Sequence, residues 1–127
     1  MADRGRISTL AHFAERFAAS SVPGVAALAE APFATQLTLR ARPGSPVAAA
    51  VAERLGGPLP TEPNTAWCGP GLDVLWLGPD EWLVVAPEHA AVDLELALAR
   101  TGATVVDVSA QRTIVDLTGA AAAEVLA

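Results

Sequence analysis

The sequence predicts an α+β fold, and three observations lead to it. Residues 33–40 alternate between apolar and polar side chains as a half-buried strand does, residues 46–55 carry helix signals, and residues 73–86 read as strand, turn and strand. In chain order the expected elements run strand, helix, strand, strand, helix, strand. This is the order of a ferredoxin-like split β-α-β sandwich, an antiparallel sheet with helices on one face. An extra C-terminal strand and helix follow it.

The N-terminal segment is expected to form an arm or first helix over residues 1–22. Its apolar residues recur at near-helical spacing, at Ile7, Leu10, Ala14 and Phe17. Pro23 and Gly24 then interrupt the pattern. We therefore divide the chain into this arm or helix and a single α+β domain over residues 23–127.

A strand and a helix open the domain. In residues 33–40 the side chains of Phe33, Thr35, Leu37 and Leu39 are expected on one face. Ser45 can cap the following helix, Pro46 suits its first position, and Gly56 can end it. Residues 58–71 are rich in proline and glycine, so we expect a surface connection with at most a short strand near Trp67.

The hairpin is the clearest element of the sequence. Residues 73–77 and 82–86 are joined by Gly78-Pro79-Asp80-Glu81, where Pro79 presets the turn dihedral. If Leu77 lies opposite Trp82, then Leu75 meets Val84, Trp76 meets Leu83, and Val74 meets Val85, and both faces are apolar. A sheet with helices on one side only is expected to be polar on the other, so the pattern predicts a partner surface here.

Residue composition and flanking proline and glycine residues predict the remaining elements. Residues 88–100 repeat their apolar side chains every two positions, but their alanine, glutamate and leucine content favours a helix, with Pro87 before it and Gly102 after it. Strands are expected over residues 104–108 and 112–117. The last helix is expected to begin after Gly119.

Composition and charge exclude several classes of function. The chain has 127 residues, 52% of them apolar, and a formal net charge of −6. All eight basic residues are arginines scattered along the sequence, which argues against nucleic-acid binding. No apolar stretch is long enough to span a membrane, the N-terminus lacks the apolar core of a signal peptide, and one cysteine fits a reducing compartment. We therefore expect a cytoplasmic protein.

The sequence contains few candidates for chemistry. His12 and His89 lie far apart with no third residue at metal-ligand spacing, and Cys68 has no activating base near it in the sequence. Gly69-Pro70-Gly71 is too short for a phosphate loop. We expect no catalytic, cofactor-binding or metal-ligating residue in this chain, which describes an interaction domain more than an active site.

A family resemblance becomes visible at the hairpin and the last two strands. The segments that carry it are Trp76-Leu77-Gly78-Pro79-Asp80-Glu81-Trp82-Leu83-Val84-Val85, Val106-Asp107-Val108-Ser109-Ala110-Gln111-Arg112-Thr113 and Leu117-Thr118-Gly119-Ala120. Together they resemble the gamma subunit of heterotetrameric sarcosine oxidase, within the superfamily of the glycine-cleavage T-protein. Ser8-Thr9-Leu10-Ala11-His12 looks like the opening motif of that family, with Thr9 where proline is common. The resemblance covers most of the chain.

The resemblance implies a non-catalytic, assembly-stabilising subunit of a bacterial oxidoreductase of one-carbon metabolism. That heterotetramer oxidatively demethylates sarcosine to glycine, makes hydrogen peroxide, and passes the one-carbon unit to tetrahydrofolate as 5,10-methylenetetrahydrofolate. FAD, FMN, NAD and tetrahydrofolate are then expected in the larger partner subunits. Seven residues are the expected contacts with those subunits: Leu10, His12, Phe13, Val74, Trp76, Trp82 and Leu83.

Two alternatives and one departure from the family accompany this interpretation. The chain could instead be a free-standing folate-binding protein of the T-protein kind, with its ligand near residues 67–71, or a homodimeric α+β module that closes an open sheet face on itself. The family usually continues well past the helix that begins after Gly119, whereas this sequence stops at Ala127. We therefore expect either a shortened family member or a truncated chain.

Overall fold

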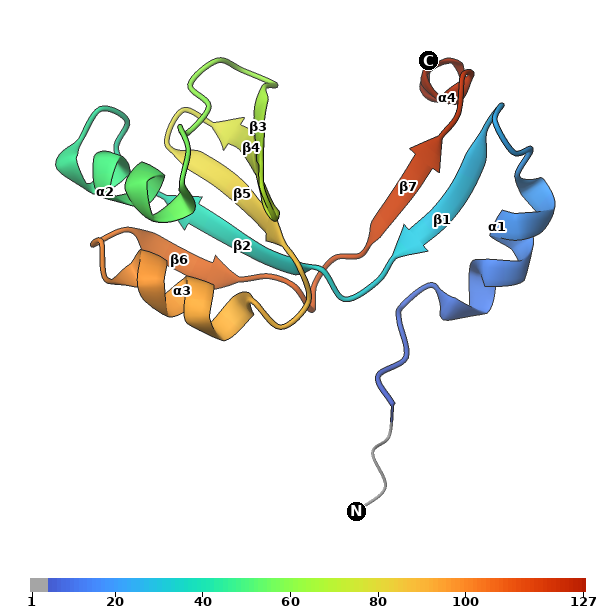
Figure 1. Ribbon diagram of the computed structural model, residues 1–127, viewed down its shortest axis with the longest axis horizontal. Coiled ribbons are helices and arrows are strands. Elements are labelled where there is room, and N and C mark those ends of the chain that lie inside the picture. The colour runs from blue at the N-terminus through green and yellow to red at the C-terminus, as the bar shows by residue number, and fades with distance from the viewer. Residues whose placement is uncertain (1–4) are drawn as a thin grey trace. The chain divides into compact units, whose positions relative to one another are not determined.

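The computed structural model describes residues 5–127, so the first four residues of the expected arm lie outside the described part. The chain divides into two compact units (Figure 1). Unit 1 comprises the residues up to Phe33 together with Arg112–Ala127, and unit 2 comprises Ala34–Gln111. The division into an arm over 1–22 and one domain over 23–127 stays a prediction, because compactness alone does not show which segments fold independently.

Unit 2 is built on a five-stranded sheet in which all neighbouring strands are antiparallel. Its strand order is β3-β4-β5-β2-β6. The strands are β2 (Thr35–Arg40), β3 (Ala66–Gly69), β4 (Leu72–Gly78), β5 (Glu81–Ala86) and β6 (Thr104–Asp107). Helix α2 (Pro46–Leu55) connects β2 to β3, and helix α3 (Ala91–Ala99) connects β5 to β6. In this order the α2 connection passes two strands, β5 and β4, and the α3 connection passes one strand, β2. The predicted α+β class is confirmed.

Helix α2 forms where its sequence signals place it. The Ala48 amide donates a hydrogen bond to Ser45 Oγ at 3.1 Å, Pro46 is the first helical residue, and Gly56 ends the helix with φ = 78°. This left-handed conformation is one that glycine adopts without steric cost. Helix α3 is shorter than the segment 88–100 predicted for it, because His89 takes a positive φ of 71° before the helix begins.

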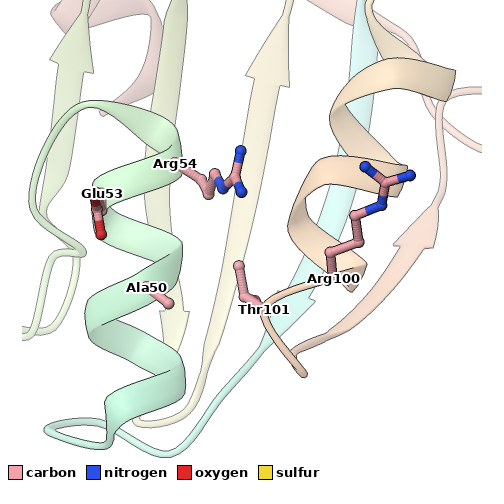
Figure 2. Close-up of a pocket in the computed structure, with 5 residues that line it drawn as sticks. All are labelled: Ala50, Glu53, Arg54, Arg100 and Thr101. Atoms are coloured by element: carbon pink, nitrogen blue, oxygen red, sulfur yellow. The ribbon is translucent and has the colours of Figure 1, made fainter.

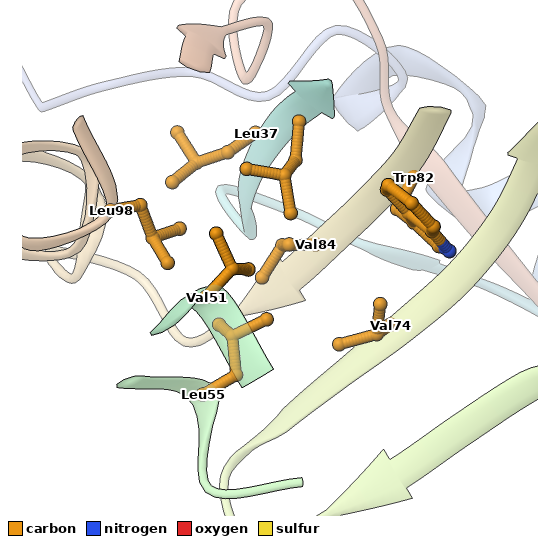
Figure 3. Close-up of a cluster of buried hydrophobic side chains, with 8 residues drawn as sticks. Leu37, Val51, Leu55, Val74, Trp82, Val84 and Leu98 are labelled. Atoms are coloured by element: carbon orange, nitrogen blue, oxygen red, sulfur yellow. The ribbon is translucent and has the colours of Figure 1, made fainter. Parts of the chain in front are cut away.

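The core of unit 2 lies between one face of the sheet and these two helices (Figure 3). Its buried side chains come from β2, β4, β5, α2 and α3: Leu37, Leu39, Val74, Trp82, Val84, Val51, Leu55 and Leu98. Each such apolar side chain contributes about 1.5–3 kcal/mol of burial free energy. The polar end of Trp82 is also satisfied, since its Nε1 donates to the Pro60 carbonyl at 2.7 Å. Both helices therefore cover the same face of the sheet.

The register of the hairpin differs from the prediction by one residue. Trp76 lies opposite Trp82 and Leu75 opposite Leu83, and the pairing shifts between Trp76 and Gly78. The irregularity takes up Leu77, which therefore does not pair with Trp82. A shift of one residue exchanges the two faces of a strand, so the expected pairs Leu75 with Val84 and Trp76 with Leu83 are wrong.

Unit 1 joins the two ends of the described chain. A 3₁₀ turn (Ala11–Phe13) leads into helix α1 (Ala14–Ser20), and β1 (Ala27–Ala31) pairs antiparallel with β7 (Ile114–Thr118) before helix α4 (Ala122–Leu126). The sequence did not predict β1, whose residues Ala-Leu-Ala-Glu-Ala have low strand propensity. The predicted strand from residue 33 begins at residue 35 instead, because Phe33 has a positive φ of 61°.

Candidate functional site

The expected contact residues are divided between the two units. Leu10, His12 and Phe13 lie in unit 1, at the start of the 3₁₀ turn and within it. Val74, Trp76, Trp82 and Leu83 lie on the β4–β5 hairpin of unit 2.

Two of the hairpin residues belong to the core. Val74 is 0% exposed and Trp82 is 1% exposed, and both contribute to the cluster beneath α2 and α3. The corrected register explains this position, since both side chains lie on the helix-covered face. Both side chains therefore face the core in this chain, and a partner contact at Val74 and Trp82 stays a prediction.

The face of the sheet turned away from the helices carries a continuous row of side chains across all five strands. The register aligns Val106, Thr38, Leu83, Leu75 and Ala66 in this order from β6 to β3. We call these five residues the outer row. Four of the five are apolar, Leu83 and Leu75 are half-buried, and Val106 is 49% exposed. Within residues 34–111 no helix covers this face, so apolar side chains meet solvent where a polar face is expected.

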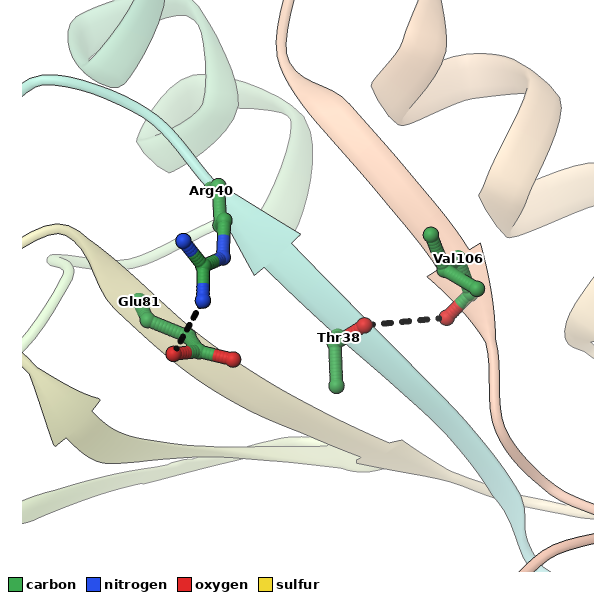
Figure 4. A network of polar contacts seen from close by, with 4 residues as sticks. All are labelled: Thr38, Arg40, Glu81 and Val106. Carbon is green, nitrogen blue, oxygen red and sulfur yellow. Dashed lines mark hydrogen bonds and ion pairs between the residues drawn. The ribbon is translucent and has the colours of Figure 1, made fainter.

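Polar pairs border the outer row on both sides. On one side Arg40 Nη2 lies 2.9 Å from Glu81 Oε2 across β2 and β5, and within the row itself Thr38 Oγ1 donates to the Val106 carbonyl at 3.4 Å (Figure 4). On the other side Cys68 lies opposite Asp73. An apolar centre bounded by charged groups is the usual composition of a protein–protein interface.

Trp76 lies at the margin of the core. It pairs with Trp82 in the register, and its backbone amide donates to the Thr65 carbonyl at 3.0 Å. The indole is half-buried, and its Nε1 is buried without a hydrogen-bond partner among the described residues. An unpaired indole N–H carries a desolvation cost of about 1–3 kcal/mol.

In unit 1 the carboxylate of Glu30 holds the segment that carries the expected contact residues. This side chain accepts hydrogen bonds from Ser8 Oγ at 2.6 Å, from the Leu10 amide at 3.2 Å, and from Thr113 Oγ1 at 2.6 Å. One strand residue thus ties the N-terminal segment to the segment that precedes β7. Sequence analysis did not single out Glu30, because its partners lie 20, 22 and 83 residues away.

The electrostatics of Glu30 follow from these contacts. The hydrogen bonds from Ser8 and Thr113 lower the pKa of its carboxyl group, and the Leu10 amide and the charge of His12 act in the same direction. Next to it, the Phe13 ring lies 4.3 Å from the His12 ring and 6.1 Å from the Phe17 ring. His12 is exposed, while Leu10 and Phe13 are half-buried. Leu10, Phe13 and His12 therefore form a surface whose position depends on Glu30.

The candidates for chemistry have structural explanations. Cys68 is exposed on β3, and its hydrogen bond to Asp73, with the negative charge of that group, raises the pKa of the thiol. A raised pKa disfavours the nucleophilic thiolate. Residues 5–127 contain no group of three His, Cys, Asp or Glu side chains that could hold a metal ion. No helix in the same range is both long and apolar enough to cross a membrane.

Comparisons with known proteins decide the family. A profile described as "Sarcosine oxidase, gamma subunit family" matches residues 40–127. The chain belongs to this family. It is 44% identical over 124 residues to sarcosine oxidase subunit gamma of an Arthrobacter species, and 45% identical to that of Corynebacterium sp. strain P-1. Both alignments cover 95% of this chain and 61% of the relative, so the gamma-family chain described here spans about three fifths of their length.

A solved structure extends the comparison to the fold. One chain of heterotetrameric sarcosine oxidase from Corynebacterium sp. U-96, in complex with pyrrole 2-carboxylate, superposes with a TM-score of 0.85 and 40% sequence identity. The match covers 94% of the gamma-family chain and 64% of that chain. The resemblance inferred from the hairpin and the last two strands is confirmed.

Proposed function

We propose that this chain acts as the gamma subunit of a heterotetrameric sarcosine oxidase and stabilises its assembly without contributing catalytic residues. The observation that supports this most directly is the TM-score of 0.85, over 94% of the chain, with a chain of a solved heterotetrameric sarcosine oxidase. The complex would oxidise sarcosine to glycine, reduce oxygen to hydrogen peroxide, and transfer the one-carbon unit to tetrahydrofolate.

The cofactors are assigned to the larger subunits. FAD, FMN, NAD and tetrahydrofolate are expected there from the family resemblance. The residues of this chain do not fit a nucleotide site, because its one short glycine-rich segment, Gly69-Pro70-Gly71, follows an edge strand and opens no helix. The subunit would therefore belong to a cofactor-dependent enzyme and hold its partners in place. We assign it to the cytoplasm, which its single cysteine fits.

The outer row is the proposed docking face of unit 2. Its side chains, four of them apolar, form a continuous row across five strands, and the Arg40–Glu81 pair borders this row. Leu83 is the expected contact residue that lies at its centre, between Thr38 and Leu75. Burying such a patch against a larger subunit would yield about 25 cal/mol for every Å² of apolar area removed from water.

Unit 1 supplies a second proposed contact through Leu10, His12 and Phe13. These residues lie at the surface, and the hydrogen bonds of Glu30 hold the segment that carries them. An ordered segment loses less conformational entropy on docking than a free arm does. We propose that it contacts a larger subunit as well.

Co-purification tests the proposed function. The tagged chain, co-expressed with the large subunits of the same source, is expected to recover a yellow flavin-containing complex with sarcosine oxidase activity. Recovery of a colourless chain without those subunits would contradict the proposal. Saturable tetrahydrofolate binding by the isolated chain would favour the folate-binding alternative, and a tight dimer by light scattering would favour the homodimeric one.

A pair of matched variants tests the docking face. Leu83→Asp places a charge at the centre of the outer row, whereas Val92→Asp places the same charge on α3, at a side chain that is 75% exposed. We expect Leu83→Asp to weaken association with the large subunits at least tenfold and Val92→Asp to change it less than twofold. Equal binding by both variants would contradict this docking face.

A further inference from the structure

A hollow between the C-terminal ends of α2 and α3 gathers positive charge in an acidic chain. Its volume is about 510 Å³, and Ala50, Glu53, Arg54, Arg100 and Thr101 line it (Figure 2). The whole chain has eight arginines, no lysine and a formal net charge of −6. Two of the eight arginines, Arg54 and Arg100, therefore line this one hollow of unit 2.

These two arginines differ from most of the others in what they contact. Arg40 pairs with Glu81, Arg6 stacks on Phe33 and Arg16 stacks on Phe13. Neither Arg54 nor Arg100 makes a side-chain hydrogen bond, ion pair or ring contact with another residue of the described range 5–127. Their guanidinium groups can therefore bind an external acceptor without giving up an internal one.

Two arginines and one glutamate line the hollow, so the net formal charge of its lining is positive. Figure 2 shows the Arg54 side chain reaching toward the gap between α2 and α3, with Arg100 running along α3 and Glu53 on the side of α2 turned away from α3. The Thr101 hydroxyl is occupied, because it donates to the Leu98 carbonyl at 2.6 Å. Two guanidinium forks therefore border the hollow, Arg54 at the gap and Arg100 along α3, and each can bind a carboxylate through two parallel hydrogen bonds, while the Glu53 carboxylate also lines the hollow.

The helix ends decide what kind of anion fits. Arg54 lies in the last turn of α2 and Arg100 is the C-terminal cap of α3, where the helix dipoles carry partial negative charge. That charge stabilises the arginines and weakens the attraction for a free ion in water. A carboxylate on a docked protein is held near the site by the rest of the interface, so a modest local attraction suffices.

We propose that the Arg54–Arg100 hollow receives an acidic side chain of a larger subunit and fixes the orientation in which this chain docks. The inference rests on the proposed function and adds to it a second, electrostatic contact on unit 2. Charged contacts of this kind set the association rate and the register of an interface, while apolar contacts supply most of its affinity. The outer row and the hollow would therefore have different roles in the same assembly.

Charge reversal with a matched control tests the proposal. The variants are Arg54→Glu, Arg100→Glu and the double variant, and the control is Arg42→Glu, at an exposed arginine that does not line the hollow. Association with the purified large subunits is measured at 50 mM and 300 mM NaCl. We expect the double variant to bind at least tenfold more weakly than wild type at 50 mM and to lose most of the salt dependence, and Arg42→Glu to change binding less than threefold. Circular dichroism shows whether each variant is folded, and Arg54→Gln/Arg100→Gln serves if a reversal unfolds the chain.

The outcomes separate this inference from the proposed function. If the wild-type chain binds the large subunits and the double variant binds like Arg42→Glu, the hollow is not a docking site although the proposed function stands. If the wild-type chain does not bind them at all, both are wrong. Saturable binding of inorganic phosphate by the isolated chain, lost in the double variant, would assign the hollow to a free anion and would overturn docking.

Discussion

Replacing Gly119 by alanine is expected to disrupt unit 1 and leave unit 2 folded. Gly119 has φ = 119°, and a Cβ atom there would collide with the Val25 carbonyl group and lie 2.9 Å from the Ala26 amide nitrogen. These are backbone atoms, which cannot move away by a change of rotamer as a flexible side chain can. The adjacent connection includes the hydrogen bond from the Ala121 amide to the Val25 carbonyl at 2.8 Å.

The expected cost has two parts. A non-glycine residue held at a sparsely populated backbone conformation costs about 1–3 kcal/mol. Displacing the chain also weakens the hydrogen bonds from Ala120 to Gly24 and from Ala121 to Val25, each contributing about 1 kcal/mol. We expect a local loss of about 3 kcal/mol, which corresponds to a roughly hundredfold larger equilibrium constant for opening of the β1–β7 pair.

Hydrogen exchange of the β1 amides measures this opening, and Gly24→Ala is the matched control. Gly24 also has a positive φ, 78°, but nothing lies within 4 Å of the position of its Cβ. That variant should lose only the conformational part, about 1 kcal/mol. Tryptophan fluorescence should not change, since Trp67, Trp76 and Trp82 all lie in unit 2. Equal protection of β1 in both variants would refute the steric argument.

Three further results are expected. Gly57→Ala should shift tryptophan emission and lower stability by about 1–2 kcal/mol, because the added methyl would overlap the Trp67 ring, whereas unchanged emission would contradict the packing. Leu98→Ala should cost about 2–5 kcal/mol in urea unfolding, since Leu98 is 0% exposed, and a loss below 1 kcal/mol would place it outside the core. The pKa of Glu30 is lowered from 4.5, so its carboxylate stabilises unit 1 above that pH and the stabilisation is lost as the pH falls through the folded-state pKa. The protection factor of the Leu10 amide, relative to its intrinsic exchange rate at each pH, should therefore fall in acid, and Glu30→Gln should remove that pH dependence.

Local signals predicted much of unit 2. Ser45, Pro46 and Gly56 act on their own neighbours, and they placed α2 correctly. The hairpin was found for the same reason. The predicted register of the hairpin was wrong because of the irregularity at Leu77. That irregularity depends on how the turn and both strands pack, and no single residue in the sequence indicates it. That one-residue shift also decided which hairpin side chains were assigned to a partner surface.

Long-range contacts account for what sequence analysis missed. Strand β1 has an alanine-rich sequence and exists because it pairs with β7, about 90 residues further along the chain. The outer row requires the order and register of all five strands, so Val106 and Leu75 could not be connected to Leu83 beforehand. The role of Glu30 depends in the same way on Thr113.

The pairing of Cys68 with Asp73 affects how the purified protein behaves in air. An exposed thiol ordinarily oxidises and cross-links two chains, and the reacting species is the thiolate. Because the neighbouring carboxylate raises the pKa of this thiol, little thiolate is present near neutral pH and cross-linking should be slow. A dimer found by light scattering without reductant would therefore reflect non-covalent association, and the same sample would be suitable for attaching a single probe at alkaline pH.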